Sequence, residues 1–227
     1  MCGRFTSSVR GSELRERFQV AVPDGYVERY NLAPTQRAAI VRRSPHGREA
    51  ALARWGLLPA WAKDASIGYK LINARAETLT EKPAFRSLLH RHRCLVLADG
   101  FYEWRIAPDG TREPVRFHLA DGGPFAFAGL WTARRDDPAG ELLESFTIVT
   151  TRPNELVAPV HDRMPAILLP ELEDEWLDPE ISREHALALL EPYDARAMRA
   201  EPASRRVNSV RNDDPGLLVP DELLPAA

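Results

Sequence analysis

Proline is the residue type that most constrains how this chain can fold. Nineteen prolines are spread through its 227 residues, and each one lacks a backbone N–H and has a fixed φ. Helices and inner strands do not run far across such residues, so the sequence predicts short elements throughout. With 44% hydrophobic residues, the chain still has enough apolar side chains for a packed core. This composition excludes a disordered chain.

The apolar patterns predict a mixture of strands and short helices. Strands are predicted over residues 38–41, 51–57, 94–98, 125–131 and 146–151. Helices are predicted over residues 13–18 with Ser12 as the cap, 84–92 after Pro83, 171–177 and 183–190. We therefore expect a single α+β domain, with a mixed, mostly antiparallel and barrel-like β-sheet core and inserted and flanking helices.

Several classes of protein are excluded by what the sequence lacks. No run approaches the roughly 20 apolar residues that span a bilayer, and the first residues have no apolar segment typical of a secretory signal. Two cysteines form no disulfide framework, and no His, Cys, Asp and Glu residues follow a metal-ligand spacing. We expect a cytoplasmic protein in a reducing environment, with no membrane partner, metal or cofactor.

Charge is distributed unevenly along the chain. Residues 1–118 carry a net charge of +8, whereas the remainder carries −11. Only three of the 30 basic residues are lysines, and arginine suits phosphate because its planar guanidinium donates two hydrogen bonds at once. This pattern fits a basic face for a polyanion such as nucleic acid, and it also fits a simple compositional bias toward arginine.

Cys2 has special chemistry if Met1 is removed, because it then carries an α-amine and a thiol on adjacent carbons. An α-amine has an ordinary pKa of about 7.7–8.0, so much more of it is unprotonated near neutral pH than for a lysine. The amine can attack an aldehyde to give an imine, and the neighbouring thiol can close a thiazolidine ring. No internal cysteine can do this.

Three further segments set a polar side chain among apolar neighbours. Asn73 follows Leu71 and Ile72, and a buried amide requires hydrogen-bond partners. Glu103 lies between aromatic residues, which disfavour the charged carboxylate and suit a general acid. His161 lies between two prolines, in a segment with restricted backbone freedom. Each of these residues could equally be structural, and Cys94 in its apolar strand reads as a small core residue.

Six short motifs can be recognised along the chain: Met1–Phe5, Tyr30–Thr35, Trp55–Trp61, Asn73–Thr78, Gly100–Trp104 and His161–Pro165. Taken together, they resemble the SRAP family, whose members form covalent crosslinks with abasic sites in single-stranded DNA. The resemblance covers residues 1 to about 212 as one abasic-site-processing domain and leaves 213–227 as a C-terminal tail. Ala62 departs from members that carry a second aromatic residue after Trp61.

The resemblance implies a role for each of the reactive residues. Cys2 is the implied nucleophile that captures the ring-opened sugar aldehyde, and Asn73 holds the terminal amine or the sugar. Glu103 moves protons during sugar opening and imine formation. His161 assists proton transfer at the sugar hydroxyl and in reversal of the crosslink. Members of the family are also thought to remove Met1 themselves, which makes the same site a cysteine peptidase with a single turnover.

The resemblance also implies how DNA is held. Arg4, Arg75 and Arg163 each lie beside a reactive residue in the sequence, where they would clamp phosphates without reading bases. Further residues implied to line the DNA channel are Asn31, Trp61 and Thr150. The implied partner is single-stranded DNA containing an abasic site, bound by a monomer in the cytoplasm, or at the nucleoid in a bacterium.

Two other functions remain compatible with the residues alone. An N-terminal-nucleophile amidohydrolase would use the Cys2 thiol to attack an amide, with the α-amine as base. A noncovalent DNA-binding or adaptor module would leave Cys2 inert. Abasic DNA distinguishes them, because only covalent capture gives a shifted band on a denaturing gel that disappears with Cys2→Ala.

Overall fold

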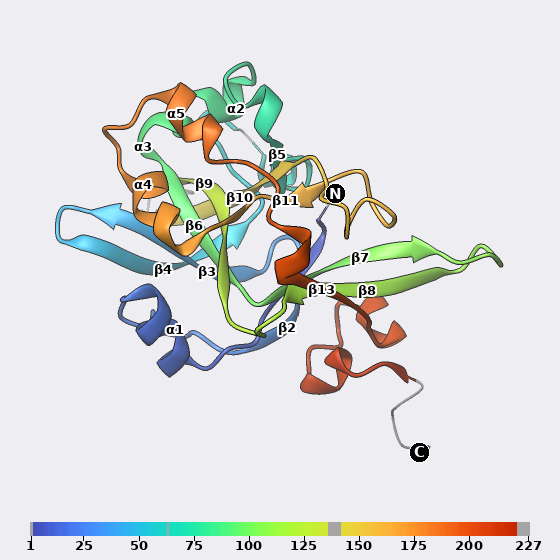
Figure 1. Cartoon of the computed structure of the whole chain (residues 1–227). Coiled ribbons are helices and arrows are strands. Elements are labelled where there is room, and N and C mark those ends of the chain that lie inside the picture. Colours follow the sequence, from blue (N-terminus) through green and yellow to red (C-terminus); the bar gives the residue numbers. More distant parts are fainter. Residues whose placement is uncertain (1, 63, 136–141, 222–227) are drawn as a thin grey trace.

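The computed structural model describes residues 2–62, 64–135 and 142–221, which form a mixed α+β fold built on two sheets (Figure 1). The first sheet has the strand order β13 (Met198–Pro202), β8 (Arg112–Leu119), β7 (Gly100–Ile106), β1 (Arg4–Ser7) and β2 (Arg29–Leu32). The second contains β11 (Met164–Pro165), β10 (Leu142–Thr151), β4 (Gly47–Trp55), β3 (Arg37–Ser44), β6 (Arg93–Ala98), β9 (Phe125–Arg135), β12 (Ile167–Leu168) and β5 (Asn73–Arg75).

Five strands of the second sheet close into a small barrel. β3 pairs with β4 and β6, β6 pairs with β9, β9 pairs with β10, and β10 returns to β4. These pairs are antiparallel except that of β10 with β4, and β10 also runs parallel to β5. Closure leaves no open edge among the five strands. The expected antiparallel, barrel-like α+β core is therefore confirmed.

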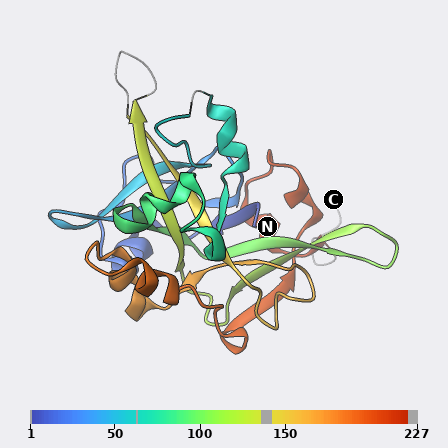
Figure 2. The same cartoon turned by 90° about the horizontal axis from the view of Figure 1, so that it is seen from above.

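The helices are short and gather mainly around the barrel, with the group α2 to α5 together at one end (Figure 1). Their bounds are α1 (Gly11–Phe18), α2 (Pro83–Arg86), α3 (Leu88–Arg91), α4 (Glu173–Leu177) and α5 (Arg183–Ala188). The 3-10 turns are η1 (Ala65–Lys70), η2 (Ala76–Thr78), η3 (Pro170–Leu172), η4 (Ala195–Ala197), η5 (Arg205–Asn208) and η6 (Pro215–Leu218). Viewed from above, the β7–β8 hairpin projects on the side away from these helices (Figure 2).

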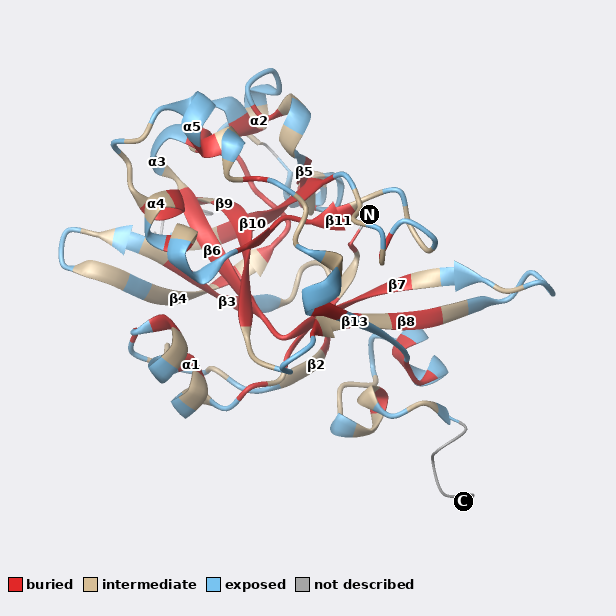
Figure 3. Ribbon diagram, viewed as in Figure 1, coloured by how far each residue is buried: buried red, intermediate tan, exposed pale blue. Residues whose placement is uncertain are grey.

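Side-chain alternation in the strands produces two large cores. In β6, Leu95 and Leu97 pack with the helices, whereas Cys94 and Val96 face a second core that includes Phe5 of β1 and Phe101 of β7. This is the two-residue period of a strand buried on both faces. The strands at the centre are buried, and the outer half of the β7–β8 hairpin is exposed (Figure 3). The second core is where the site lies.

Some predicted boundaries were wrong for local reasons. The helix predicted over 84–92 is divided into α2 and α3 by a break at Ser87. Ser12 does not cap the first helix, because α1 begins at Gly11 and Ser12 therefore lies inside it. Arg10 is the residue at the N-cap, and its side chain makes no capping hydrogen bond. The strand predicted over 51–57 ends at Trp55, since Gly56 has a φ of 114°. A Cβ at Gly56 would lie 2.7 Å from the carbonyl oxygen of Gly68.

The C-terminal segment is fastened to the first sheet, as far as residue 221 is described. Asp213 accepts hydrogen bonds from the backbone N–H groups of Tyr30 (2.6 Å) and Asn31 (3.0 Å) on β2. Leu217 is fully buried in a small third core beside Tyr102. The residues beyond 221, and Met1, lie outside the described residues.

Candidate functional site: a buried cysteine among an amide, a carboxylate and an imidazole

Cys2 lies two residues before β1, in the core between the two sheets. The side chain has no exposed surface, and its Sγ lies 3.5 Å from the carbonyl oxygen of Arg4. β1 pairs with β7 so that Arg4 lies opposite Tyr102, which brings the preceding Cys2 close to Glu103. Burial, and secondarily the negative charge of Glu103, raises the pKa of the Cys2 thiol. The thiol is therefore protonated at neutral pH.

Asn73 holds the backbone of Cys2. Its Nδ2 donates to the Cys2 carbonyl oxygen at 2.8 Å, across 71 positions of sequence. β5 is fixed by its parallel pairing with β10, and the indole of Trp55 donates to the carbonyl of Ile72 at 2.9 Å. The Asn73 Oδ1 is buried and accepts no hydrogen bond from a described residue. An acceptor in that position can receive an N–H or O–H of a bound group.

Glu103 is a buried carboxyl on the inner face of β7. Phe101 and Glu103 point to the same side of the strand, so the apolar pattern that buries Phe101 also buries Glu103, which is 4% exposed. Burial raises the pKa of Glu103 to about 7. A carboxyl with this pKa both donates and accepts protons near neutral pH.

His161 faces Glu103 from the loop before β11. Its Nε2 lies 4.0 Å from Glu103 Oε2, while the backbone N–H of Arg163 donates to its Nδ1 at 3.0 Å. Since Nδ1 accepts this bond, the proton of the neutral ring is assigned to Nε2, on the side of Glu103. Burial lowers the pKa of His161, which favours the neutral ring. The carboxylate of Asp162, 3.0 Å from Nδ1, would attract a second proton there.

The three arginines expected to clamp phosphates differ in the hydrogen bonds that their guanidinium groups form. Arg75 is exposed, and its guanidinium forms no hydrogen bond or ion pair with the described residues. The Nη1 of Arg4 donates to Asn31 Oδ1 at 2.8 Å and to the Val207 carbonyl at 2.7 Å. Arg163 forms a two-point ion pair with Glu77, with both N···O distances at 2.7 Å. Only Arg75 thus presents an unengaged guanidinium.

The remaining candidates also lie in different environments. Trp61 is 60% exposed in the turn after β4, where its ring is available to stack on a base. Asn31 is fully buried, and its Nδ2 donates to backbone carbonyls of Val207, Ser209 and Asn212. Thr150 is fully buried opposite Arg75, and its Oγ1 bonds to no described residue. Asn31 therefore supports Arg4 and the C-terminal segment rather than presenting its amide at the surface.

The sequence analysis missed two residues, the ion-pair partner of Arg163 and an exposed aromatic residue on the same segment as Trp61. Glu77, the ion-pair partner of Arg163, lies within the Asn73–Thr78 motif, but nothing in that motif indicates that it contacts Arg163. Tyr69 in η1 is 62% exposed on the same segment between β4 and β5 as Trp61. An aromatic residue in a polar, exposed turn was the available signal for Tyr69.

The described part of the chain contains neither a cluster of metal ligands nor a membrane-spanning helix. No three His, Cys, Asp or Glu side chains there come together as metal ligands. None of the described helices is both long and apolar enough to cross a bilayer. The reactive groups that the described residues bring together at the site are a thiol, an amide, a carboxyl and an imidazole.

The fold and site define a class of α+β proteins with a closed β-barrel. In this class a buried cysteine at the second position is held by an asparagine and lies near a carboxyl, which in turn faces a histidine. The chain belongs to the SOS response associated peptidase (SRAP) family, whose model matches residues 1–210. The resemblance inferred from the sequence motifs is thereby confirmed.

Individual relatives agree with this assignment. The chain is 45% identical to abasic site processing protein YoqW of Bacillus subtilis, over 96% of this chain and 99% of that protein. It is 31% identical to abasic site processing protein HMCES of Gallus gallus, over 98% of this chain and 79% of that protein. Its fold matches the crystal structure of a Bacteroides thetaiotaomicron protein with a TM-score of 0.87 and 30% identity, covering 96% of this chain and 99% of the other.

Proposed function

We propose that this chain processes abasic sites in single-stranded DNA by capturing the sugar aldehyde on the aminothiol of Cys2 after Met1 is removed. The observation that carries the proposal is that Asn73 and Glu103 meet at Cys2 from separate elements, with His161 facing Glu103. The names of relatives similar along nearly the whole chain support the substrate.

The capture reaction balances without a cofactor. The α-amine of Cys2 attacks the aldehyde carbon of the ring-opened deoxyribose, and loss of one water leaves an imine. The sulfur then bonds to the same carbon while the thiol proton passes to the imine nitrogen, closing a thiazolidine. Because the amine attacks first, the reaction begins without a thiolate, which suits a thiol whose pKa is raised by burial.

Each neighbouring group has a defined task in this scheme. Glu103, with a pKa of about 7, takes and returns protons during sugar ring opening, dehydration and ring closure. His161 carries a proton on Nε2 and serves the sugar oxygen, both in opening and in reversal of the crosslink. Asn73 keeps Cys2 in position through the 2.8 Å bond to its carbonyl, and its Oδ1 accepts a hydrogen bond from the amine or sugar.

The DNA strand is held mainly through its phosphates. Arg75 is exposed and available, while Arg4 is steadied by Asn31 beside the start of β1. Trp61 offers a ring for base stacking, which tolerates any sequence. Thr150, buried opposite Arg75, lines the inner wall of the site. Arg163 also binds a phosphate once its ion pair with Glu77 is broken.

We further propose that residues 1–212 form the processing domain and act as a monomer in the cytoplasm, or at the nucleoid if the source is bacterial. Removal of Met1 by the same site, with Cys2 as nucleophile, would expose the amine. The family model supports the extent of the domain, because it matches residues 1–210, and the word peptidase in the family's description supports removal of Met1.

The test uses a single-stranded oligonucleotide with one abasic site. The mature protein should give a band of reduced mobility on a denaturing gel, and Cys2→Ala should abolish it. The same oligonucleotide with an intact base is the control. A shift seen only on native gels would support a noncovalent adaptor, and protection of the thiol by glutamine but not by abasic DNA would support an amidohydrolase.

A further inference from the structure

Arg163 and Glu77 form a closed ion pair at the edge of the site. Both terminal nitrogens of Arg163 donate to the two carboxylate oxygens of Glu77, each at 2.7 Å. Arg163 lies just before β11, and Glu77 lies in η2, directly after β5. The arginine side chain is 13% exposed and the glutamate side chain is 55% exposed. The arginine is thus the fixed partner, and the glutamate has room to move into water.

The geometry of the guanidinium shows that this pair competes with phosphate. The edge formed by Nη1 and Nη2 is occupied by Glu77. On the other edge, Nη2 also donates to the Thr150 carbonyl at 2.8 Å, and Nε is buried without a described acceptor. A guanidinium binds phosphate best through two parallel N–H groups on one edge. Arg163 has no such edge to offer while Glu77 is in place.

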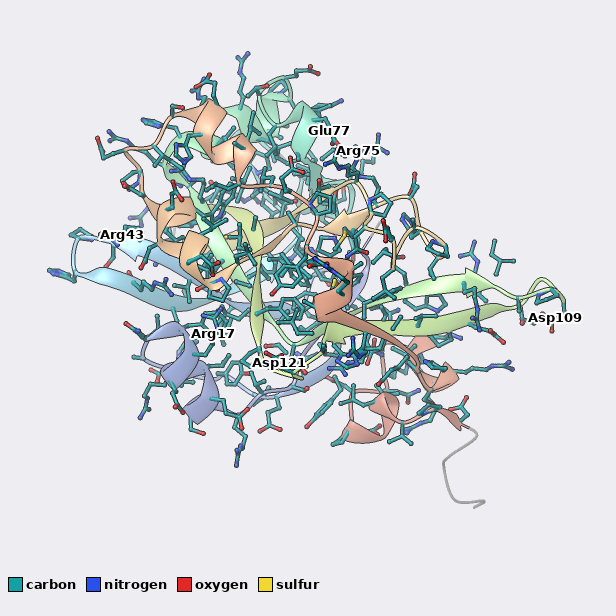
Figure 4. All side chains as sticks on the ribbon, viewed as in Figure 1. Arg17, Arg43, Arg75, Glu77, Asp109 and Asp121 are labelled. Atoms are coloured by element: carbon teal, nitrogen blue, oxygen red, sulfur yellow. The ribbon has the colours of Figure 1, made fainter. Side chains whose placement is uncertain are left out.

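Glu77 has the properties of a substitute for a DNA phosphate. A carboxylate and a phosphate present two oxygens of the same charge to a guanidinium in the same planar arrangement. Arg163 lowers the pKa of Glu77, so the carboxylate is charged at neutral pH. Glu77 also lies beside Arg75 at the edge of the molecule (Figure 4). A strand bound at Arg75 therefore brings a phosphate to the position that Glu77 occupies.

We propose that Glu77 is an internal phosphate mimic that holds Arg163 in the DNA-free protein and is displaced by a phosphate of the bound strand. The bond to Thr150 keeps Arg163 in place during the exchange, because that bond does not involve Glu77. Binding to any single strand is thereby weaker than the arginines alone would give, and durable retention depends on the covalent step. The inference rests on the proposed DNA binding, but not on the crosslink chemistry.

The experiment measures noncovalent binding of an oligonucleotide with no abasic site by fluorescence anisotropy over a series of salt concentrations. Glu77→Gln removes the competing charge and should tighten binding roughly threefold to fivefold, as for loss of a partly exposed ion pair. Glu81→Gln is the matched control, because Glu81 is exposed, four positions away, and pairs with no described residue. It removes the same charge and should change binding much less.

Arg163→Ala tests the other half of the exchange. It should weaken binding and reduce the slope of log K against log salt by about 0.7, the value for one phosphate contact on a single strand. In the Arg163→Ala background, Glu77→Gln should give no gain, because the two residues act through each other. Equal gains from Glu77→Gln and Glu81→Gln, or weaker binding by Glu77→Gln, would overturn the proposal.

A measurement on the unaltered protein guards against folding defects in the variants. Carbon NMR of the Glu77 carboxyl should show a lowered pKa in the free protein that returns toward its ordinary value when the oligonucleotide saturates the site. A Glu77 pKa that stays low in the complex would contradict displacement. Crosslinking of wild-type protein to abasic DNA is run in parallel, because its absence would refute the proposed capture while leaving the Glu77 comparison intact.

Discussion

Glu103→Gln tests whether burial keeps the carboxyl of Glu103 protonated near neutral pH. The side chain is 4% exposed, and its pKa rises from an ordinary 4.5 to about 7. Glutamine has nearly the same shape but does not titrate. Replacing the residue therefore removes the pH-dependent part of the contribution of Glu103 to stability and leaves its volume in the core.

The sign of the effect follows from the raised pKa. Between pH 4.5 and about 7, the folded protein keeps a proton on Glu103 that the unfolded chain has lost. Wild-type stability therefore falls as the pH rises through this window. One pKa unit corresponds to about 1.4 kcal/mol, so the shift from 4.5 to about 7 corresponds to about 3 kcal/mol. The free energy of unfolding of Glu103→Gln, relative to that of wild type, should therefore be higher by this amount at the alkaline end of the window than at the acid end.

The assay is urea denaturation of wild type and Glu103→Gln at several pH values across that range. Glu16→Gln, at an exposed position of α1, is the matched control and should follow wild type at every pH. The rate of crosslink formation by wild type should also show an inflection near pH 7 that Glu103→Gln lacks. Parallel stability profiles for wild type and Glu103→Gln would refute the assignment of a raised pKa.

Three further predictions concern the nucleophile, the DNA contact and the scaffold. Cys2→Ser keeps the amine and should still form an imine, so its product should reverse on dilution and be trapped by borohydride; a product as durable as that of wild type would remove the thiol from the mechanism. Arg75→Ala should weaken binding equally for strands of different sequence and lower the slope of log K against log salt by about 0.7, as measured by fluorescence anisotropy. A changed base preference would contradict a phosphate contact. Trp55→Ala should lower the free energy of unfolding in urea by about 3–5 kcal/mol. Trp55 is fully buried against Phe5, with ring centroids 5.0 Å apart, and its indole donates to the carbonyl of Ile72. A loss under about 1 kcal/mol would argue against this support.

The fold class was predictable because the apolar pattern records burial. Val96 and its neighbours in β6 are apolar on both faces, as a strand covered on both sides requires. Closure of the barrel was not predictable in detail, because it depends on β10 pairing with β4, which lies far away in sequence. The break between α2 and α3 was also missed, since residues 84–92 contain no proline or glycine to mark it.

The candidate site was predictable as a set of residue types but not as a set of contacts. Glu103 could be identified because aromatic neighbours in its strand predict burial, and burial shifts its pKa. By contrast, the hydrogen bond from Asn31 to Val207 spans 176 positions and that from Arg163 to Glu77 spans 86, and local sequence carries no record of either. The inhibitory pairing of Arg163 with Glu77 therefore emerged only from three-dimensional geometry.

The most direct test of covalent capture is the intact mass of the denatured adduct between the mature protein and an oligonucleotide with a single abasic site. The account predicts the mass of the chain without Met1 plus the oligonucleotide, less one water, with fragmentation placing the bond on Cys2. Protein and oligonucleotide recovered only as separate masses, or an adduct that retains Met1, would contradict it.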